Sequence, residues 1–261
     1  MNRRAVARLG RLLLGALGFV AALAIWEAGA RSAASFYFPP VSEVWREAVD
    51  VWPSVDFLSA VGASLKRLAA GYAIGAAAGV AVGLAMGSSH RVQRTLGPTT
   101  EFLRALPVIA VVPIAIVLLD DGDVMRIAVI GFGVSFPVLV ATVAGVRGVA
   151  PEIRDTAALL HLGTAGRTVR VYLPAALPTI FAGLRTALPI GLVLVVITEF
   201  TGTGNGLGVF IWTQQFVFDV HGMYAGILFL GLLGFVLNGL FVGLERRVLA
   251  WHYGAIGAHL R

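Results

Sequence analysis

Residues with acid–base or metal-binding chemistry are few in this chain and lie far apart. The 261 residues contain fourteen carboxylates and five histidines, and cysteine is absent. Without cysteine no disulfide or thiolate metal site can form, and the histidines lack metal-ligand spacing. No nucleophile is paired with a base, and no two carboxylates are paired as a hydrolase would need. The sequence therefore predicts no catalytic residue, no metal and no cofactor, and we expect the chain not to be an enzyme.

Nucleotide binding is also not predicted for this chain. Its only lysine is Lys66, in the context GASLKRL, which cannot complete the G-x-x-x-x-G-K-[ST] phosphate loop. If ATP powers the protein, another polypeptide must therefore supply the ATPase.

The composition is that of an all-α polytopic membrane protein. Hydrophobic residues make up 58% of the chain and charged residues 13%, with a mean hydropathy of +0.86. Apolar runs of roughly 18 residues or more indicate membrane-spanning helices. We predict a helix bundle with about six spans, of which the third is short and interrupted by proline. The expected spans are 12–29, 63–87, 106–119, 125–146, 179–199 and 223–244.

The distribution of basic residues predicts the orientation. With the N-terminus inside, 15 of the 20 lysines and arginines lie on the inner side and 5 on the outer side. This bias predicts that both termini and the loop at 151–178 are cytoplasmic. The net charge of +6 needs no nucleic-acid partner, because the arginines are spread over helix ends without interleaved aromatic residues.

The predicted organisation is one membrane domain with additions at its ends. We expect an N-terminal helix and outer segment at 1–59, the membrane domain at 60–245, and a cytoplasmic tail at 246–261. A second outer segment, about 200–222, contains the glycine-rich TGTGNGLG. The acidic DDGD at 120–123 is interpreted only as a turn.

Glycine recurs at every fourth residue in the second expected span. Four residues slightly exceed one helical turn, so these glycines form one slowly drifting groove. A neighbouring helix can approach closely there, and we predict a role in helix packing rather than a substrate groove. The glycines are Gly71, Gly75, Gly79, Gly83 and Gly87.

The loop at 151–178 is polar but carries helix signals. Pro151 suits a first helical position, and Gly163 suits a left-handed residue after a helix. Thr164 is suited to cap a second short helix, which should end near Leu173-Pro174. Such a compact helical pair on the polar face of a membrane protein predicts a docking site.

The end of the fifth expected span has two interpretations that the sequence leaves open. Glu199, beside Thr201, is either part of a gate or binding-protein contact, or a solvated carboxylate at the membrane boundary. Pro189, in the middle of the same span, should kink it. We take these three residues as a possible translocation path or gate.

These segments together resemble the permease subunits of ABC importers. The loop is similar to their coupling loop, with Asp155-Thr156-Ala157 at the EAA position, then Gly163, then a closing LP at Leu173-Pro174. Here Asp155 replaces the family's glutamate and Thr156 its first alanine. Segments 102–119, 183–191 and 197–208 are similar to the nitrate, sulfonate and taurine branch.

The resemblance implies a type I importer fold and a division of labour. Cytoplasmic ATPase subunits would dock on Asp155, Thr156, Ala157, Gly163 and Pro174. A second permease copy, expected as a homodimer, and an extracytoplasmic solute-binding protein would complete the transporter in the bacterial inner membrane. The solute would be a small anion of the sulfonate, nitrate or taurine type.

Two alternatives from other classes stay open on the residues alone. An ion-coupled secondary transporter would work without an ATPase, although no acidic residue lies at the centre of an expected span. A structural membrane subunit would carry no solute.

Overall fold

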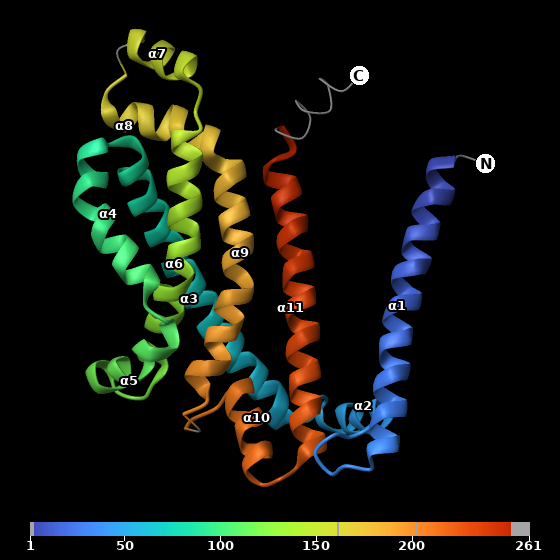
Figure 1. The fold of residues 1–261 in the computed structure, drawn as a ribbon. Helices are drawn as coiled ribbons and strands as arrows, with labels where there is room; N and C mark the ends of the chain where they lie inside the picture. Colours follow the sequence, from blue (N-terminus) through green and yellow to red (C-terminus); the bar gives the residue numbers. More distant parts are fainter. Residues whose placement is uncertain (1–2, 161, 202, 252–261) are drawn as a thin grey trace. The chain divides into compact units, whose positions relative to one another are not determined.

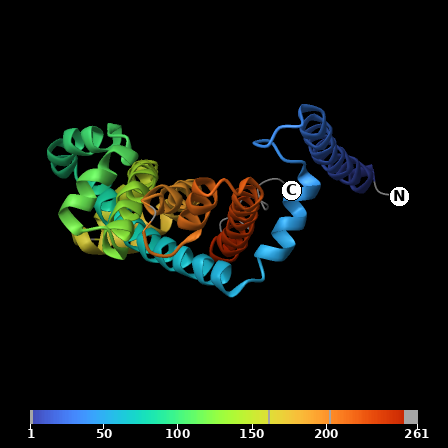
Figure 2. The same ribbon diagram turned by 90° about the horizontal axis from the view of Figure 1, so that it is seen from below.

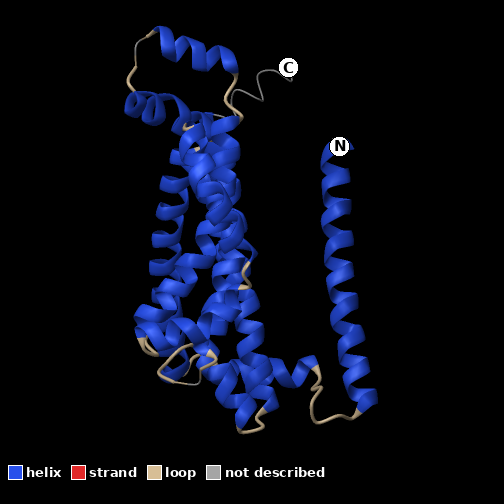
Figure 3. Cartoon of the chain, turned by 60° about the vertical axis from the view of Figure 1, so that its left-hand side comes forward, coloured by secondary structure: helices blue, strands red, loops and turns tan. Residues whose placement is uncertain are grey.

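The computed structural model describes residues 3–160, 162–201 and 203–251, and this part contains helices and loops without a strand (Figure 3). The predicted all-α architecture is thereby confirmed. The chain divides into two compact units. One contains the residues up to Ser59 together with Phe210–Leu230, and the other contains Ala60–Val209 together with the chain from Gly231.

The first unit contains α1 (Arg3–Ala33), α2 (Val41–Val51), the first residues of α3, most of α10 (Leu207–Phe216) and the start of α11 (Val220–Val248). The loop between α1 and α2 turns the chain from one helix into the next (Figure 2). Its core is aromatic: the buried Phe57 ring lies 5.0 Å from Phe210 and 4.9 Å from Phe229. Trp52 donates its indole N–H to the carbonyl of Ala225 at 3.2 Å.

The second unit contains the helices that position the candidate sites. These are α3 (Val55–Ser88), α4 (His90–Ala105), α5 (Val108–Leu119), α6 (Asp123–Arg147), α7 (Pro151–Leu159), α8 (Thr164–Arg167), a π-helical turn (Thr168–Tyr172), α9 (Leu173–Glu199) and the rest of α11. Figure 1 shows α6 and α9 running alongside each other, with α7 and α8 at one end.

Helix α6 forms the centre of this unit. Its residues Ile130, Val134 and Val138 are fully buried and pack in one cluster with Leu68 of α3 and Leu194 of α9. A helix that is apolar on several faces is expected inside a bundle, because each face must be covered by a neighbour.

The glycine groove of α3 lies against α6. A Cβ atom built on Gly71 would lie 2.7 Å from Cβ of Ile130, and one built on Gly87 would lie 2.7 Å from Cβ of Val146. Cβ atoms on Gly79 and Gly83 would similarly meet Val138 and Thr142 of α6, and one on Gly75 would collide with the backbone of Gly131. The backbones of α3 and α6 can therefore approach closely, because the glycines of α3 carry no side chains along this contact.

These contacts yield a stability prediction with a control in the same helix. Gly75→Ala is expected to lower the free energy of unfolding by about 1–3 kcal/mol, because the methyl group would overlap the Gly131 backbone. Gly62→Ala, where an added Cβ has nothing within 4 Å, should be neutral or stabilising. Thermal unfolding in detergent measures both. Equal midpoints for the two variants would contradict a packing role for the groove.

The direction of α3 and α6 determines the path between them. Gly71 meets Ile130 and Gly87 meets Val146, so the two helices run parallel. The chain must therefore return between them, through α4 and α5, which meet at a 97° bend. Among the described residues, five helices are long and apolar enough to span a membrane, and this bent pair makes a sixth span if it is taken as one. The expected number of about six spans is confirmed in this sense, and the irregular third span is explained by the bend.

Candidate functional site

Two polar regions of the second unit lie at opposite ends of α6 and α9. One surrounds Asp123 at the start of α6 and Glu199 at the end of α9. The other is the polar loop, which follows the end of α6 at Arg147 and leads into α9 at Leu173. A 25-residue helix such as α6 is about 37 Å long, so the two regions are separated by roughly the thickness of a membrane.

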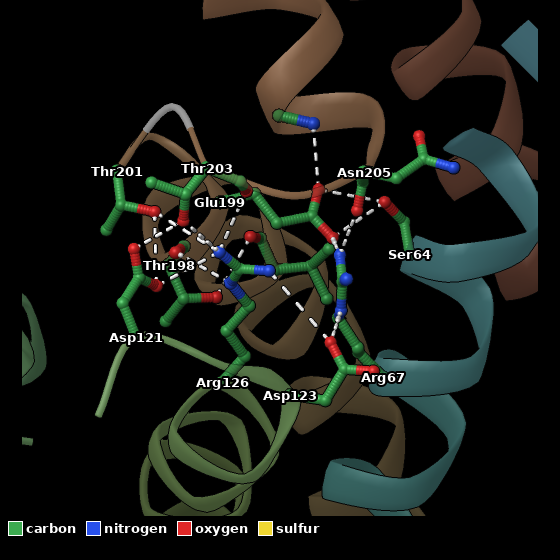
Figure 4. A network of polar contacts seen from close by, with 12 residues as sticks. Ser64, Arg67, Asp121, Asp123, Arg126, Thr198, Glu199, Thr201, Thr203 and Asn205 are labelled. Carbon is green, nitrogen blue, oxygen red and sulfur yellow. Dashed lines mark hydrogen bonds and ion pairs between the residues drawn. The ribbon is translucent and has the colours of Figure 1, made fainter. Parts of the chain in front are cut away.

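Glu199 is the buried centre of the first region (Figure 4). Its carboxylate is fully inaccessible and accepts hydrogen bonds from the Ser64 hydroxyl at 2.8 and 2.9 Å, the Gly208 N–H at 2.8 Å and Arg67 Nη1 at 2.6 Å. The interpretation of Glu199 as a solvated carboxylate is therefore wrong. The sequence did not show its counter-ion, because Arg67 lies 132 residues earlier.

The Arg67 guanidinium joins α3 to three other segments of the chain. Besides Glu199 of α9, its guanidinium donates to the Asp123 carboxylate at 2.7 Å and to the Asn205 carbonyl at 2.5 Å. Because Arg67 belongs to α3 and Asp123 begins α6, one side chain ties α3, α6, α9 and the glycine-rich loop together. Charge-assisted bonds of this kind are the strong ones in proteins.

Arg126 forms a second, equally buried centre beside the first (Figure 4). Its guanidinium pairs with Asp121 at 3.0 Å and donates to the Thr203 carbonyl at 3.0 Å and to the Thr201 hydroxyl at 3.3 Å. Thr203 also donates its hydroxyl to Asp121. The interpretation of DDGD as no more than a turn is therefore wrong, since two of its aspartates hold buried arginines.

We call these side chains the ion-pair network, which comprises Ser64, Arg67, Asp121, Asp123, Arg126, Glu199, Thr201 and Thr203. Its two arginines face three carboxylates, so the charges nearly balance. The small residues of the loop are needed beside it: a Cβ on Gly206 would collide with the Glu199 carboxylate, and one on Gly208 would lie 2.7 Å from Glu199 Cβ. The network thus fixes Thr201, the segment 203–206 and the start of α10 to α3 and to the ends of α6 and α9.

Of the expected gate residues, the structure brings Glu199 and Thr201 into this network. Pro189 lies ten residues before Glu199, inside α9, which is one helix from Leu173 to Glu199. The residues of the network that sequence reasoning missed are Ser64, Arg67, Asp121, Asp123, Arg126 and Thr203. Their only signal was the presence of arginines near the ends of apolar spans, where a charge needs a partner.

In the second region, the expected helical pair forms but differs in its details. Helix α7 begins at Pro151, as its sequence indicates. The expectation that Gly163 is left-handed is wrong: its φ lies outside that region, and its carbonyl accepts the first backbone bond of α8, from Arg167. The second helix does not end at Leu173-Pro174 either, because a π-helical turn at Thr168–Tyr172 leads directly into α9.

The π-helical turn explains how a helix continues through Pro174. Proline lacks a backbone N–H and is tolerated in the first turn of a helix, and Pro174 lies there in α9. Figure 1 shows that the chain changes direction between α8 and α9. The predicted stop is therefore replaced by a bend, which places α8 across the end of α9.

Helix α7 rests on the end of α6 and leaves several apolar side chains exposed. Arg154 donates to the carbonyls of Val146 at 3.1 Å and Arg147 at 2.6 Å, the last ones of α6. Ala157 is buried beneath the helix at 3% exposure. Ile153, Leu159 and Leu160 are exposed, with Leu159 at 78%. Asp155 and Thr156 are also exposed, so they and the apolar side chains share the accessible surface.

Comparison with known proteins relates this arrangement to transport proteins. Residues 71–250 match the family model described as "Binding-protein-dependent transport system inner membrane component". An aliphatic sulfonates transport permease protein, SsuC of Bacillus subtilis, is 32% identical over 72% of this chain and 68% of its own. The bicarbonate transport system permease protein CmpB of Synechococcus elongatus is 30% identical over 93% and 91%. The nitrate import permease protein NrtB of Leptolyngbya laminosa is 30% identical over 90% and 86%.

Solved structures are similar in fold. A chain of a bacterial alginate ABC transporter, in complex with an alginate pentasaccharide-bound periplasmic protein, superimposes with a TM-score of 0.65 at 13% identity, over 94% of this chain and 96% of that one. A chain of an amino acid ABC transporter superimposes with a TM-score of 0.57 at 18% identity, over 74% and 92%.

Proposed function

The chain belongs to the family of binding-protein-dependent transport system inner membrane components, and on this premise we propose that it forms the translocation path for a small anion and couples it to a separate ATPase. A member of this family is a transport subunit and not an enzyme. The observation that carries the proposed coupling is α7, a short helix fixed to the end of α6 with exposed apolar side chains.

The proposed solute class follows from the relatives. Their names refer to sulfonates, bicarbonate and nitrate, which are all small anions. The identity to each relative is near 30%, which suits a shared class better than one shared solute. We therefore propose an anionic solute, which the separate solute-binding protein would select.

The proposed mechanism uses α6 and α9 as levers. Both helices connect the polar loop at one end with the ion-pair network at the other. ATPase subunits that close on nucleotide would move α7 and α8, and the two helices would carry this movement across the membrane. The network end would then change between closed and open arrangements.

The proposed assembly follows from the orientation of the chain in the membrane. With 15 basic residues on the inner side against 5 on the outer, α7 and both termini face the cytoplasm. Cytoplasmic ATPase subunits dock on the surface around Asp155 and Thr156, with Ala157 as a small support beneath it. An extracytoplasmic solute-binding protein meets the opposite end, and a second copy of the chain completes a homodimer.

Affinity purification tests this function. The tagged chain, expressed with the genes beside its own, is purified in mild detergent and its partners are identified by mass spectrometry. We expect a stoichiometric ATPase subunit that is lost when Asp155 and Gly163 are both changed. A chain that purifies alone and transports solute in vesicles, with transport abolished by uncouplers, would instead establish a secondary transporter.

A single substitution gives a finer prediction. Gly163→Val should fold and insert, because an added Cβ has nothing within 4 Å and the backbone is not left-handed. The branched side chain would still crowd a partner that docks at the start of α8, so solute-stimulated ATP hydrolysis should fall about tenfold or more. Gly163→Ala is the milder control. Undiminished hydrolysis with valine would contradict docking at Gly163.

A further inference from the structure

A strongly basic pocket lies beside α7 and takes no part in the proposed docking surface. Its volume is about 660 Å³, within the usual range of small-molecule sites. It opens where α3 ends and α4 begins, next to the last residue of α6. The polar side chains that line it include His90, Gln93, Arg94, Arg147 and Arg154.

The charge of this pocket is uncompensated within the described part of the chain. Three arginines line it, no carboxylate does, and none of the three forms an ion pair with the described residues. Arg67, Arg104 and Arg126, in contrast, each pair with a carboxylate. A concave site of one sign attracts a ligand of the opposite sign.

Arg154 gives a second indication that a ligand is needed. While its Nη2 bonds to the last carbonyls of α6, its Nε is buried and has no hydrogen-bond partner in the described part of the chain. Buried donors normally find an acceptor, because an unsatisfied one costs free energy. An oxyanion in the pocket would supply that acceptor.

The N-terminus of α4 adds to this field. Ser89 caps the helix, its side chain accepting from the Val92 N–H, and the first turn has no acidic residue. The positive end of this 16-residue helix therefore adjoins the same pocket through His90.

We propose that this pocket binds a phosphate group, that of an anionic phospholipid. The pocket lies where α3 ends at Ser88 and α6 at Arg147, which is the depth of lipid headgroups if these helices span the membrane. Basic pockets between helices at the cytoplasmic side are suited to such headgroups. The bound phosphate joins α4, α6 and α7, so it braces the helix that is proposed to receive the ATPase. The phosphate site does not depend on that proposed function.

The test measures stabilisation of the purified chain by defined probes. Thermal unfolding in detergent is followed during titration with phosphatidylglycerol, with zwitterionic phosphatidylcholine, and with inorganic phosphate. Ligand that binds the folded state raises the midpoint. We expect phosphatidylglycerol to raise it, phosphatidylcholine to leave it unchanged, and inorganic phosphate to act only at much higher concentration.

Matched variants locate the effect. The double variant Arg94→Gln with Arg147→Gln should need roughly 30 times more phosphatidylglycerol for the same rise in the midpoint. The two arginines are expected to contribute about equally to lipid binding. Arg94→Lys with Arg147→Lys should retain most of it. The control, Arg91→Gln with Arg246→Gln, removes the same charge outside the pocket and should respond as the unmodified chain does.

Each outcome decides the proposal. A response to inorganic phosphate that equals that of the lipid, and that is lost in the glutamine variant, would retain the phosphate site but assign it to a soluble ligand. An equal response of the glutamine variant and the unmodified chain, or equal losses in the glutamine variant and the control, would overturn the site. If no ATPase subunit co-purifies with the unmodified chain but the lipid response is as expected, only the proposed function is overturned.

Discussion

Replacing Arg67 with methionine is expected to lower the free energy of unfolding by about 3–5 kcal/mol, because it leaves the buried carboxylate of Glu199 without a cation. Methionine retains much of the apolar volume, so the loss would reflect charge rather than a cavity. Ser64 and Gly208 would still donate to Glu199, but neither neutralises it. Thermal or denaturant unfolding in detergent, followed by tryptophan fluorescence, measures the effect.

The two partners of this ion pair should not be equivalent. Glu199→Gln leaves Arg67 paired with Asp123 at 2.7 Å, whose side chain is 66% exposed, so this change should cost less than Arg67→Met. Arg104→Met removes the exposed pair with Glu101 and should cost no more than about 1 kcal/mol. A larger loss of unfolding free energy for Glu199→Gln than for Arg67→Met would contradict this account, in which the unpaired Glu199 carboxylate is the main cost.

The parts of the fold that depend on local pattern could be predicted from the sequence. Apolar runs indicate the spans, and the four-residue glycine repeat of α3 marks the face that lies against α6. The family that the loop motif suggests, an ABC importer permease of the nitrate and sulfonate branch, is confirmed by the comparisons. Such features are encoded within one helix or one motif, so a single sequence displays them.

The ion-pair network could not be predicted, because its pairs connect distant segments. Arg67 lies 56 residues from Asp123 and 132 from Glu199, and nothing local indicates that these residues meet. The continuation of the helix through Pro174 could not be predicted either. A π-helical turn just before it shifts the helix so that proline falls in a first turn. Local rules predicted a stop where the tertiary arrangement allows a bend.

Replacing Leu159 with aspartate is expected to weaken ATPase docking strongly while leaving the fold intact. Leu159 is 78% exposed at the end of α7, with exposed Ile153 in the same helix and exposed Leu160 directly after it, so the chain itself gains little from it. Exposed apolar side chains gathered in this way usually mark a partner's site. Burying a carboxylate in such an interface should weaken association by about 30-fold or more, roughly 2 kcal/mol.

The measurement is binding of the purified ATPase subunit in detergent, together with solute-stimulated hydrolysis in vesicles. Leu159→Met is the control, since it keeps the apolar surface, and both variants should unfold at the temperature of the unmodified chain. The exposed apolar side chains of α7 could instead lie in the membrane interface. In that case Leu159→Asp would leave ATPase binding in detergent unchanged, and the docking surface would have to be placed elsewhere on the loop. Measuring ATPase binding in detergent therefore separates the two explanations, because the bilayer is removed while the ATPase partner is present.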